Sequence, residues 1–367
     1  MHFIINRDAL LKPLQMVSGA IERRHTLPIL SNVLVEVSEQ LLSLTGTDLE
    51  VELVATTEQL QVRAQGRITV PAKKLLDICR SLPEAADIDV QLVGDNCVLS
   101  CGKTKFTLST LSAAEYPNLE SWQGEVDITL SRQQLRKLLD DTAFSMANQD
   151  VRYYLNGLLF EVDNGSLTAV GTDGHRLALS VLSLPAVSGQ QKQIIIPRKG
   201  VLEIMRLLAN DDQAITLSLG QNHLRLVDHS FSFSSKLIDG RFPDYRRVLP
   251  RNSTKQVTAH RSVIKDACTR ASILSNEKYR GVRFTLSSGE LQIMANNPEH
   301  EQAEEVIEVE YQGDGLEIGF NVGYLLDVLN TLATDLVILH LNDANSSALI
   351  EGVGNVGASY VVMPMRL

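Results

Sequence analysis

A carboxylate and an imidazole stand close together at 172–176, in the order Thr172, Asp173, Gly174, His175, Arg176. An Asp–His pair can act as an oriented general base, but hydrolysis by such a pair also needs a placed nucleophile. The chain has no G-x-S-x-G motif to supply one. Gly-Thr-Asp recurs at 46–48 without the histidine. We therefore interpret Asp173 as part of a repeated turn and predict that the chain is not an enzyme.

The segment 352–357 fits the G-x-G-x-x-G pattern of dinucleotide-binding proteins. That fingerprint requires a following helix and a downstream acid, whereas only ten residues follow here, and residues 358–363 have a strand pattern. A hairpin turn is the better interpretation. No phosphate loop is present, and the eight histidines do not pair at metal-ligand spacing. The sequence predicts neither a cofactor nor a metal.

Two segments have compositions suited to binding. Residues 149–154 join Gln149, Arg152 and two tyrosines, so either a buried tyrosine pair lies beside a solvated arginine or these groups contact phosphates and unstacked bases. Residues 361–367 are apolar for a chain end. They either complete the last sheet or line an adaptable groove, since methionine suits surfaces that accept several partners.

These segments lie within three copies of one module. The strand pattern at 32–37 recurs at 157–162 and 281–286, at offsets of 125 and 124 residues. A proline landmark at 71 recurs at 197, and residues 320–326 match its surroundings. Landmarks in constant order and spacing indicate repeated domains. We predict three, at 1–125, 126–252 and 253–367.

Each copy is predicted to contain two amphipathic helices and several alternating strands, which gives an α+β fold with helices packed on antiparallel sheets. The predicted helices are 7–24, 72–82, 131–147, 198–209, 261–274 and 322–333. They hold 16 Lys and Arg against 8 Asp and Glu, although the chain as a whole carries a net charge of −10. Either the basic side chains are simply solvated, or they form one surface that attracts a polyanion.

The sequence also bounds the compartment. It starts without a signal peptide and contains no apolar run of the ~20 residues that a membrane span needs. None of the four cysteines forms a C-x-x-C pair, and Cys97 and Cys101 are expected to be buried thiols of a strand. A cytoplasmic protein without a membrane partner is expected.

The chain resembles, from end to end, the beta subunits of bacterial DNA polymerase III, the sliding clamps. Long, specific segments carry the resemblance: 11–14, 26–30, 149–155, 172–177, 239–250, 275–278 and 363–367. The resemblance implies a head-to-tail homodimeric ring of six clamp domains with helices lining the hole. Such a ring would encircle duplex DNA without sequence specificity and confer processivity on replicative and repair polymerases. A separate clamp loader and proteins carrying a short Gln- and Leu/Phe-containing peptide would be its partners.

The resemblance also implies three sets of site residues. The expected DNA contacts are Arg24, Lys73, Gln149, Tyr153 and Tyr154, with Lys73 standing where the best-known clamp has arginine. The expected partner-peptide groove comprises Arg152, Leu155, Thr172, Gly174, His175, Arg176, Leu177, Pro243, Arg247, Val248, Asn321, Tyr324, Ser347, Val361, Val362, Met363, Pro364, Met365 and Arg366. The expected dimer interface comprises Lys74, Lys103, Phe106, Leu108, Ile273, Leu274, Glu299, Glu301 and Glu305. The alternative is a scaffold or enzyme that reuses the fold without binding a polyanion.

Overall fold

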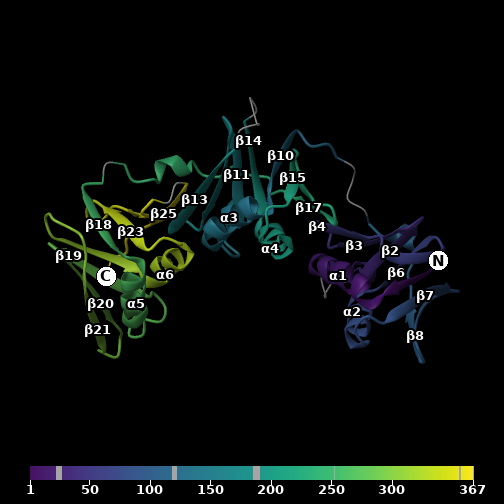
Figure 1. Ribbon diagram of the computed structural model, residues 1–367. Helices are drawn as coiled ribbons and strands as arrows, with labels where there is room; N and C mark the ends of the chain where they lie inside the picture. The colour runs from purple at the N-terminus through teal and green to yellow at the C-terminus, as the bar shows by residue number, and fades with distance from the viewer. Residues whose placement is uncertain (22–26, 118–121, 185–190, 252, 355–356, 367) are drawn as a thin grey trace. The chain divides into compact units, whose positions relative to one another are not determined.

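The computed structural model describes the chain except residues 22–26, 118–121, 185–190, 252, 355–356 and 367 (Figure 1). The described chain divides into two compact units, which are treated separately below. One unit contains residues 1–133 and 202–237, and the other contains residues 134–201 and 238–367. Both combine antiparallel sheets with helices, as the sequence predicts.

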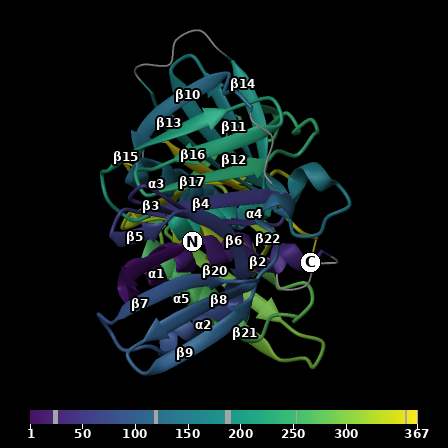
Figure 2. The ribbon, with the colours of Figure 1, turned by 90° about the vertical axis from the view of Figure 1, so that its right-hand side faces the viewer.

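The first unit contains two sheets. A five-stranded sheet has the order β5-β1-β7-β8-β9, and its last three strands run side by side in Figure 2. An eight-stranded sheet has the order β10-β15-β16-β17-β4-β3-β2-β6. The strands are β1 (His2–Asn6), β2 (Asn32–Ser38), β3 (Leu41–Thr47), β4 (Val51–Thr57), β5 (Leu60–Ala64), β6 (Gly66–Pro71), β7 (Asp87–Val93), β8 (Asn96–Cys101), β9 (Thr104–Ser109), β10 (Val126–Ser131), β15 (Ala214–Leu219), β16 (His223–Val227) and β17 (Phe231–Lys236).

The second unit also contains two sheets. An eight-stranded sheet has the order β14-β11-β12-β13-β25-β24-β23-β18, and a four-stranded sheet has the order β21-β20-β19-β22. The strands are β11 (Gly157–Asp163), β12 (Ser166–Thr172), β13 (Arg176–Ser183), β14 (Lys192–Pro197), β18 (Lys255–His260), β19 (Gly281–Ser287), β20 (Glu290–Asn296), β21 (Gln302–Glu308), β22 (Leu316–Asn321), β23 (Leu336–Leu341), β24 (Ala348–Gly352) and β25 (Ala358–Val362).

Six α-helices appear in the described residues, two for each predicted repeat. All six predicted helices are confirmed, although the first and the third end early, at Val17 and Thr142, and each continues as a short 3-10 turn. Residues 22–24 of the first predicted helix lie outside the described residues. Side-chain caps define two starts: the Oδ1 atoms of Asn6 and Asn321 accept backbone N–H groups of the first turns of α1 and α6. The helices are α1 (Arg7–Val17), α2 (Ala72–Ser81), α3 (Arg132–Thr142), α4 (Arg198–Leu207), α5 (Arg261–Ser272) and α6 (Val322–Thr331).

The helices bury one apolar face against the sheets. Helix α1 packs on α2 and on β3 and β4, and α5 packs on α6 and on β20 and β21. Leu10 and Leu14 of α1 and Ile264 and Ala267 of α5 are almost completely buried. Their i, i+3 and i+4 spacing places them on one face, and burying each large side chain stabilises the fold by about 1.5–3 kcal/mol.

Consecutive repeats are joined by backbone ladders within single sheets. Strand β17 of the middle repeat pairs with β4 of the first, and β13 pairs with β25 of the third. The middle repeat therefore contributes strands to both eight-stranded sheets. The predicted boundaries after residues 125 and 252 fall between strands, but the sheets continue across them, and these boundaries stay a prediction.

Three smaller expectations concern turns, thiols and membrane spans. Strands β24 and β25 pair in antiparallel fashion around the glycine pattern, which confirms the hairpin. All four cysteines are free, and burial raises the pKa of Cys97 to about 11. Cys101 is only half-buried, because it ends β8, so its expected burial is wrong. Within the described ranges, no helix is long and apolar enough to cross a membrane.

Candidate functional site

A cavity of about 190 Å³ opens in the second unit, where the turn between β12 and β13 meets the C-terminal strand. Apolar and aromatic groups form most of its wall. The lining residues are Arg152, Tyr154, Leu155, Thr172, Gly174, Arg176, Leu177, Phe242, Pro243, Tyr245, Val248, Val361 and Met363. A small apolar cavity with a few polar groups at its rim is suited to binding an apolar side chain of a partner.

The C-terminal strand supplies one wall. Leu177 of β13 lies opposite Val361 of β25 in the antiparallel ladder. Beyond the strand, the Met363 N–H donates to the His175 carbonyl at 2.9 Å, and the Met365 N–H donates to the Gly319 carbonyl at 2.9 Å. The chain end therefore completes a sheet, and Met363 lines the cavity; its role in an adaptable groove for partners stays a prediction.

Asp173 holds the turn at the cavity mouth. Its Oδ1 accepts the N–H groups of His175 and Arg176 at 2.9 and 3.0 Å, and the Thr172 hydroxyl donates to the Arg176 carbonyl at 2.6 Å. Gly174 has φ of +90°, a conformation in which other residues are strained. These contacts confirm the interpretation of Asp173 as a turn residue.

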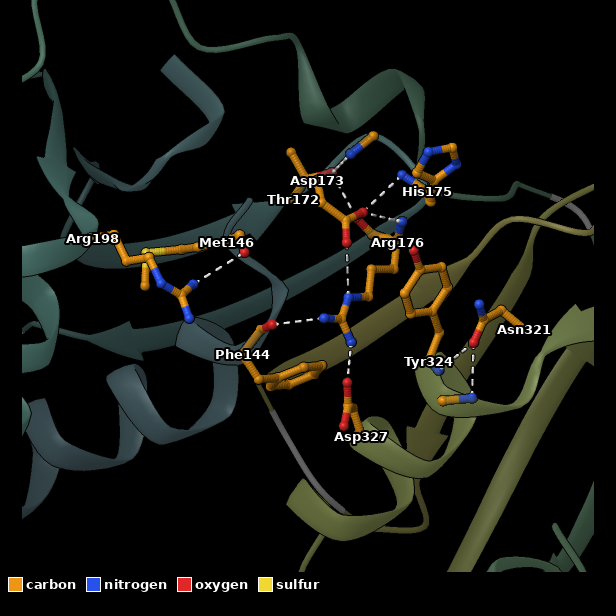
Figure 3. Close-up of polar contacts among 12 residues, drawn as sticks. Phe144, Met146, Thr172, Asp173, His175, Arg176, Arg198, Asn321, Tyr324 and Asp327 are labelled. Atoms are coloured by element: carbon orange, nitrogen blue, oxygen red, sulfur yellow. Dashed lines mark hydrogen bonds and ion pairs between the residues drawn. The ribbon is translucent and has the colours of Figure 1, made fainter. Parts of the chain in front are cut away.

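Arg176 lies at the centre of a polar network beside the cavity (Figure 3). Its guanidinium pairs with Asp173 at 3.1 Å, donates to the Phe144 carbonyl at 2.9 Å and pairs with Asp327 of α6. It also lies 4.6 Å from the centre of the Tyr324 ring. Only 12% of its side chain is exposed, so these partners fix its orientation and leave its aliphatic stem for the cavity wall.

Arg152 also lines the cavity and contacts the same turn. It pairs with Asp150 at 2.8 Å and donates to the Asp173 carbonyl at 3.1 Å. The hydrogen bond from the Arg152 side chain lowers the pKa of Asp150 to about 2, so Asp150 is ionised near neutral pH. A Cβ atom on Gly174 would lie 2.8 Å from Arg152 Nη1. The positive φ therefore favours glycine here, and a side chain at this position would also make the Arg152 guanidinium shift.

A buried carboxylate supports the cavity floor. Glu161 accepts hydrogen bonds from the Tyr245 hydroxyl at 2.5 Å, Arg246 at 2.7 Å and Gln193 at 2.8 Å. Burial alone would raise the pKa of Glu161, but these hydrogen bonds outweigh it and the net shift is downward. Burial and the bond to Glu161 raise the pKa of Tyr245. The network fixes the short helix η6 (Tyr245–Arg247), from which Tyr245 faces the cavity.

The expected groove residues separate into distinct places in the second unit. Ten line the cavity: Arg152, Leu155, Thr172, Gly174, Arg176, Leu177, Pro243, Val248, Val361 and Met363. Others border it: His175 stacks on Tyr324 with ring centres 6.4 Å apart, and Asn321 caps the helix that carries Tyr324. Arg247 and Ser347 line a separate polar hollow, and Met365 and Arg366 line another. Val362 is buried in the ladder, and Pro364 lies between the two methionines.

Sequence reasoning missed two lining residues, Phe242 and Tyr245. Both lie in the segment 239–250, which carries part of the family resemblance, and the aromatic residues of this segment are the sequence signal for a pocket wall. Tyr154, expected to contact DNA, also lines the cavity. Tyr153 beside it remains 57% exposed.

The expected DNA contacts lie in different units. Lys73 is exposed in the first turn of α2, in the first unit, and Gln149 is exposed in the second, with φ of +58°. Arg24 lies outside the described residues. Not every basic helix residue is available to DNA. Arg132, for example, is buried and pairs with Asp228 at 2.6 Å. The exposed basic groups of α1 and α2 are Lys12, Lys73, Lys74 and Arg80.

The expected interface residues form two dissimilar surfaces. In the first unit, Phe106 and Leu108 lie on β9, an edge strand, next to exposed Lys103, and Lys74 is exposed on α2. In the second unit, Ile273 is 75% exposed and Leu274 half-buried after α5, which packs on the edge strand β21. Glu305 of β21 pairs with Arg270 at 2.6 Å, while Glu299 and Glu301 are exposed.

The geometry provides no arrangement for metal or nucleophilic chemistry in the part of the chain that the structure describes. No group of three or more His, Cys, Asp and Glu side chains there could hold a metal ion. Asp173 is committed to its turn and to Arg176, and His175 is stacked on Tyr324. The site can bind an apolar group and position it by hydrogen bonds at the rim.

Comparison with known proteins covers the whole chain. Family models described as the N-terminal, central and C-terminal domains of the DNA polymerase III beta subunit match residues 1–120, 129–244 and 246–366. The beta sliding clamp of Pseudomonas putida is 54% identical, with all of both chains covered. A crystal structure of the DNA polymerase III subunit beta from Pseudomonas aeruginosa superposes with a TM-score of 0.98 at 53% identity, and the same clamp bound to griselimycin with 0.97 at 53%, each over 100% of both chains.

Proposed function

The chain belongs to the DNA polymerase III beta subunit family, and we infer that it is a sliding clamp, a non-catalytic processivity factor of DNA replication. The observation that carries this conclusion is the ordered match of all three repeats to the three clamp domains. Such a protein works with DNA and a polymerase and acts as a dimer.

Two dissimilar surfaces of one chain support a head-to-tail ring. Edge strand β9 carries exposed Lys105 and is preceded by exposed Lys103, and edge strand β21 carries exposed Glu304 and Glu308. Unpaired edge strands can add to one another, and the opposite charges favour this pairing over self-pairing of either edge. Because the contact is heterologous, it yields a closed dimer only if the rotation closes after two copies.

Duplex DNA would be held by topology and by weak contacts to phosphates. The exposed lysines of α1 and α2 and the exposed Gln149 and Tyr153 are the candidate contacts. Contacts of this kind carry no sequence information and weaken as salt rises. They suit a protein that must move along DNA.

The cavity in the second unit would bind the short motif of polymerases, repair proteins and the clamp loader. Its apolar wall fits leucine and phenylalanine side chains, and Arg152 and Thr172 provide polar groups around the rim. One methionine, Met363, lies in the wall and can adapt to different side chains. A single site for several partners would make them compete.

Retention on circular and linear DNA tests the tethering role. The protein would be loaded on a nicked plasmid by a clamp loader with ATP, and the complex separated by gel filtration before and after a restriction enzyme linearises the plasmid. We expect co-elution with the circle and release from the linear product. Retention on neither, or equal retention on both, contradicts topological tethering.

A companion measurement addresses the assembly and the peptide site. Light scattering at micromolar concentration should give twice the 40.5 kDa chain mass, and a monomer would argue against the ring. A labelled peptide containing Gln, Leu and Phe should bind with one site per chain. The cytoplasmic location expected from the sequence stays a prediction.

A further inference from the structure

A second, larger hollow lies beside the cavity and shares Val248 with it. Its volume is about 750 Å³, and polar groups dominate its lining, including Arg246, Arg247, Arg251 and Ser347. The short helix η6 lies between the two: Tyr245 lines the cavity, whereas Arg246 and Arg247 line the hollow. A chain that places one side chain in the cavity could therefore continue across η6 into the hollow.

The lining of the hollow is cationic in a chain whose net charge is −10. The lining holds three guanidinium groups and one carboxylate, Asp244, which pairs with Arg247 at 2.9 Å, and buried Glu161 pairs with Arg246 at 2.7 Å from outside the lining. Arg251 is exposed, and among the described residues no ion pair engages it. After these two pairs are counted, Arg251 leaves the lining with one unpaired positive charge.

One of these arginines is held in a fixed orientation. Arg246 donates to buried Glu161 at 2.7 Å and lies 4.6 Å from the centre of the Tyr245 ring, yet half of its side chain stays exposed. A guanidinium has five N–H donors in a planar fork, so the donors not used by Glu161 remain available in a set direction. A preoriented arginine loses less entropy when it binds a carboxylate.

We propose that this hollow binds acidic side chains of partner peptides, next to the apolar residues that enter the cavity. The proposal rests on the peptide-binding role proposed above and adds a specificity determinant to it. Carboxylates match the paired N–H groups of arginine, and Asn342, Ser346 and Ser347 add uncharged groups to the lining. Partners with Asp or Glu flanking the apolar motif would bind more tightly than partners with neutral flanks.

Continuity with the apolar cavity favours a peptide over nucleic acid. The two hollows share Val248 and the two faces of a three-residue helix, so one short segment can occupy both. The partly screened, exposed pairs that would form here contribute modestly, and their effect should weaken with salt. The expected gain is selectivity among partners and not binding as such.

Three fluorescein-labelled peptides test the proposal. The N-terminus of each is acetylated or carries the label, and the C-terminus is amidated, so that no terminal carboxylate contributes to binding. All three contain the same Gln-, Leu- and Phe-containing motif. The neutral peptide has two serines on each side of the motif. In each acidic peptide two aspartates replace the serines on one side, the N-terminal side in one peptide and the C-terminal side in the other. By anisotropy at low salt, one acidic peptide should bind the full-length protein about fivefold more tightly than the neutral peptide, and the gain should shrink at ~0.5 M salt.

Arg251→Glu provides the decisive variant, because Arg251 is exposed and lies outside the cavity lining. The acidic gain should fall below about 1.5-fold while the neutral peptide binds as before. Arg67→Glu, at an exposed arginine of β6 in the other unit, is the matched control and should keep the full gain. Circular dichroism would verify that both variants fold.

The outcomes separate this proposal from the one on which it rests. Failure of the neutral peptide to bind overturns the peptide site itself. Binding of all three peptides with equal affinity, or an acidic gain that survives in Arg251→Glu, overturns the proposal for the hollow. Loss of retention on circular DNA in Arg251→Glu, with the acidic gain intact, would assign the hollow to phosphates instead.

Discussion

The Gly-Thr-Asp turn occurs twice in the molecule with the same backbone and different consequences. At 47–51 and at 172–176 the aspartate Oδ1 accepts two backbone N–H groups at 2.8–3.0 Å. The threonine hydroxyl in each donates to the carbonyl four residues on, at 2.8 Å in the first turn and 2.6 Å in the second. The repeat therefore conserves a structural device.

What differs is the set of side chains that the turn presents. The first turn ends in Val51, which is buried in the core, and the second ends in Arg176, which reaches Asp327 of α6. The residue after the aspartate is Leu49 in the first turn and Gly174 in the second, and both have positive φ. The same turn thus supports a core in one repeat and a binding cavity in the other.

A second repeat position shows the same contrast. Glu36 of β2 and Glu161 of β11 are equivalent in the repeat alignment. The Glu36 side chain is 42% exposed and lies 4.0 Å from Arg67, whereas Glu161 is 10% exposed and has three hydrogen-bond partners. Equivalent positions of the two repeats therefore have different surroundings, and only those in the second repeat support the cavity.

Removing residues 363–367 should have the largest effect on this contrast, because it takes away the Met363 wall and its bond to the His175 carbonyl. We expect peptide binding to fall more than ~50-fold in anisotropy titrations, since a central apolar contact is lost. The dimer mass should be unchanged. Removal of Leu367 alone is the matched control, because this residue is not among the expected groove residues. Peptide affinity that stays within twofold after the longer deletion would contradict the assignment of the cavity.

Glu161→Gln should reduce the free energy of unfolding by about 2 kcal/mol, because charge-assisted hydrogen bonds to a buried group are lost. Glu36→Gln should cost less than about 0.5 kcal/mol. Both can be measured by urea denaturation at pH 7. Equal losses at the two positions would remove the contrast between the repeats.

The Glu161 effect should also depend on pH. Its pKa is lowered in the folded protein from an ordinary 4.5, so ionisation favours folding above that value. The stability difference between wild type and Glu161→Gln should be constant above pH ~5.5 and shrink as the pH falls through the lowered pKa. A difference that grows on acidification would show the opposite shift.

Gly174→Ala should weaken the peptide about tenfold, because φ of +90° disfavours a side chain and its Cβ would meet Arg152 at 2.8 Å. In the first repeat, Leu49→Gly should relieve strain and leave peptide binding unchanged. Anisotropy and thermal unfolding of both variants provide the test. Full binding by Gly174→Ala would show that the approach of Arg152 is unimportant.

Asp327→Asn should have the smallest effect, a three- to fivefold loss of peptide affinity, because Arg176 keeps Asp173 and the Phe144 carbonyl as partners. Asp266→Asn, at an exposed position of α5, is the matched control. A loss as large as that of Gly174→Ala would mean that α6 alone orients Arg176.

Much of the fold followed from spacing in the sequence. The offsets near 125 located the repeats, apolar periodicity located all six helices, and glycines with alternating neighbours located the last hairpin. The ends of the helices followed less well from the sequence. Helix α1 stops at Val17, although its apolar pattern extends to Ile21. Arg132 was counted as surface charge, and only packing revealed its buried pair with Asp228.

The sequence by itself determined the three repeats, their α+β composition and the turn at Asp173, because these depend on local periodicity and short-range hydrogen bonds. Only the tertiary structure decided which turn becomes a cavity. Arg176, Tyr245, Val248 and Met363 are far apart in the chain and meet because β25 pairs with β13 and η6 is held by Glu161. Such long-range pairing depends on the whole sheet, and no local pattern specifies it.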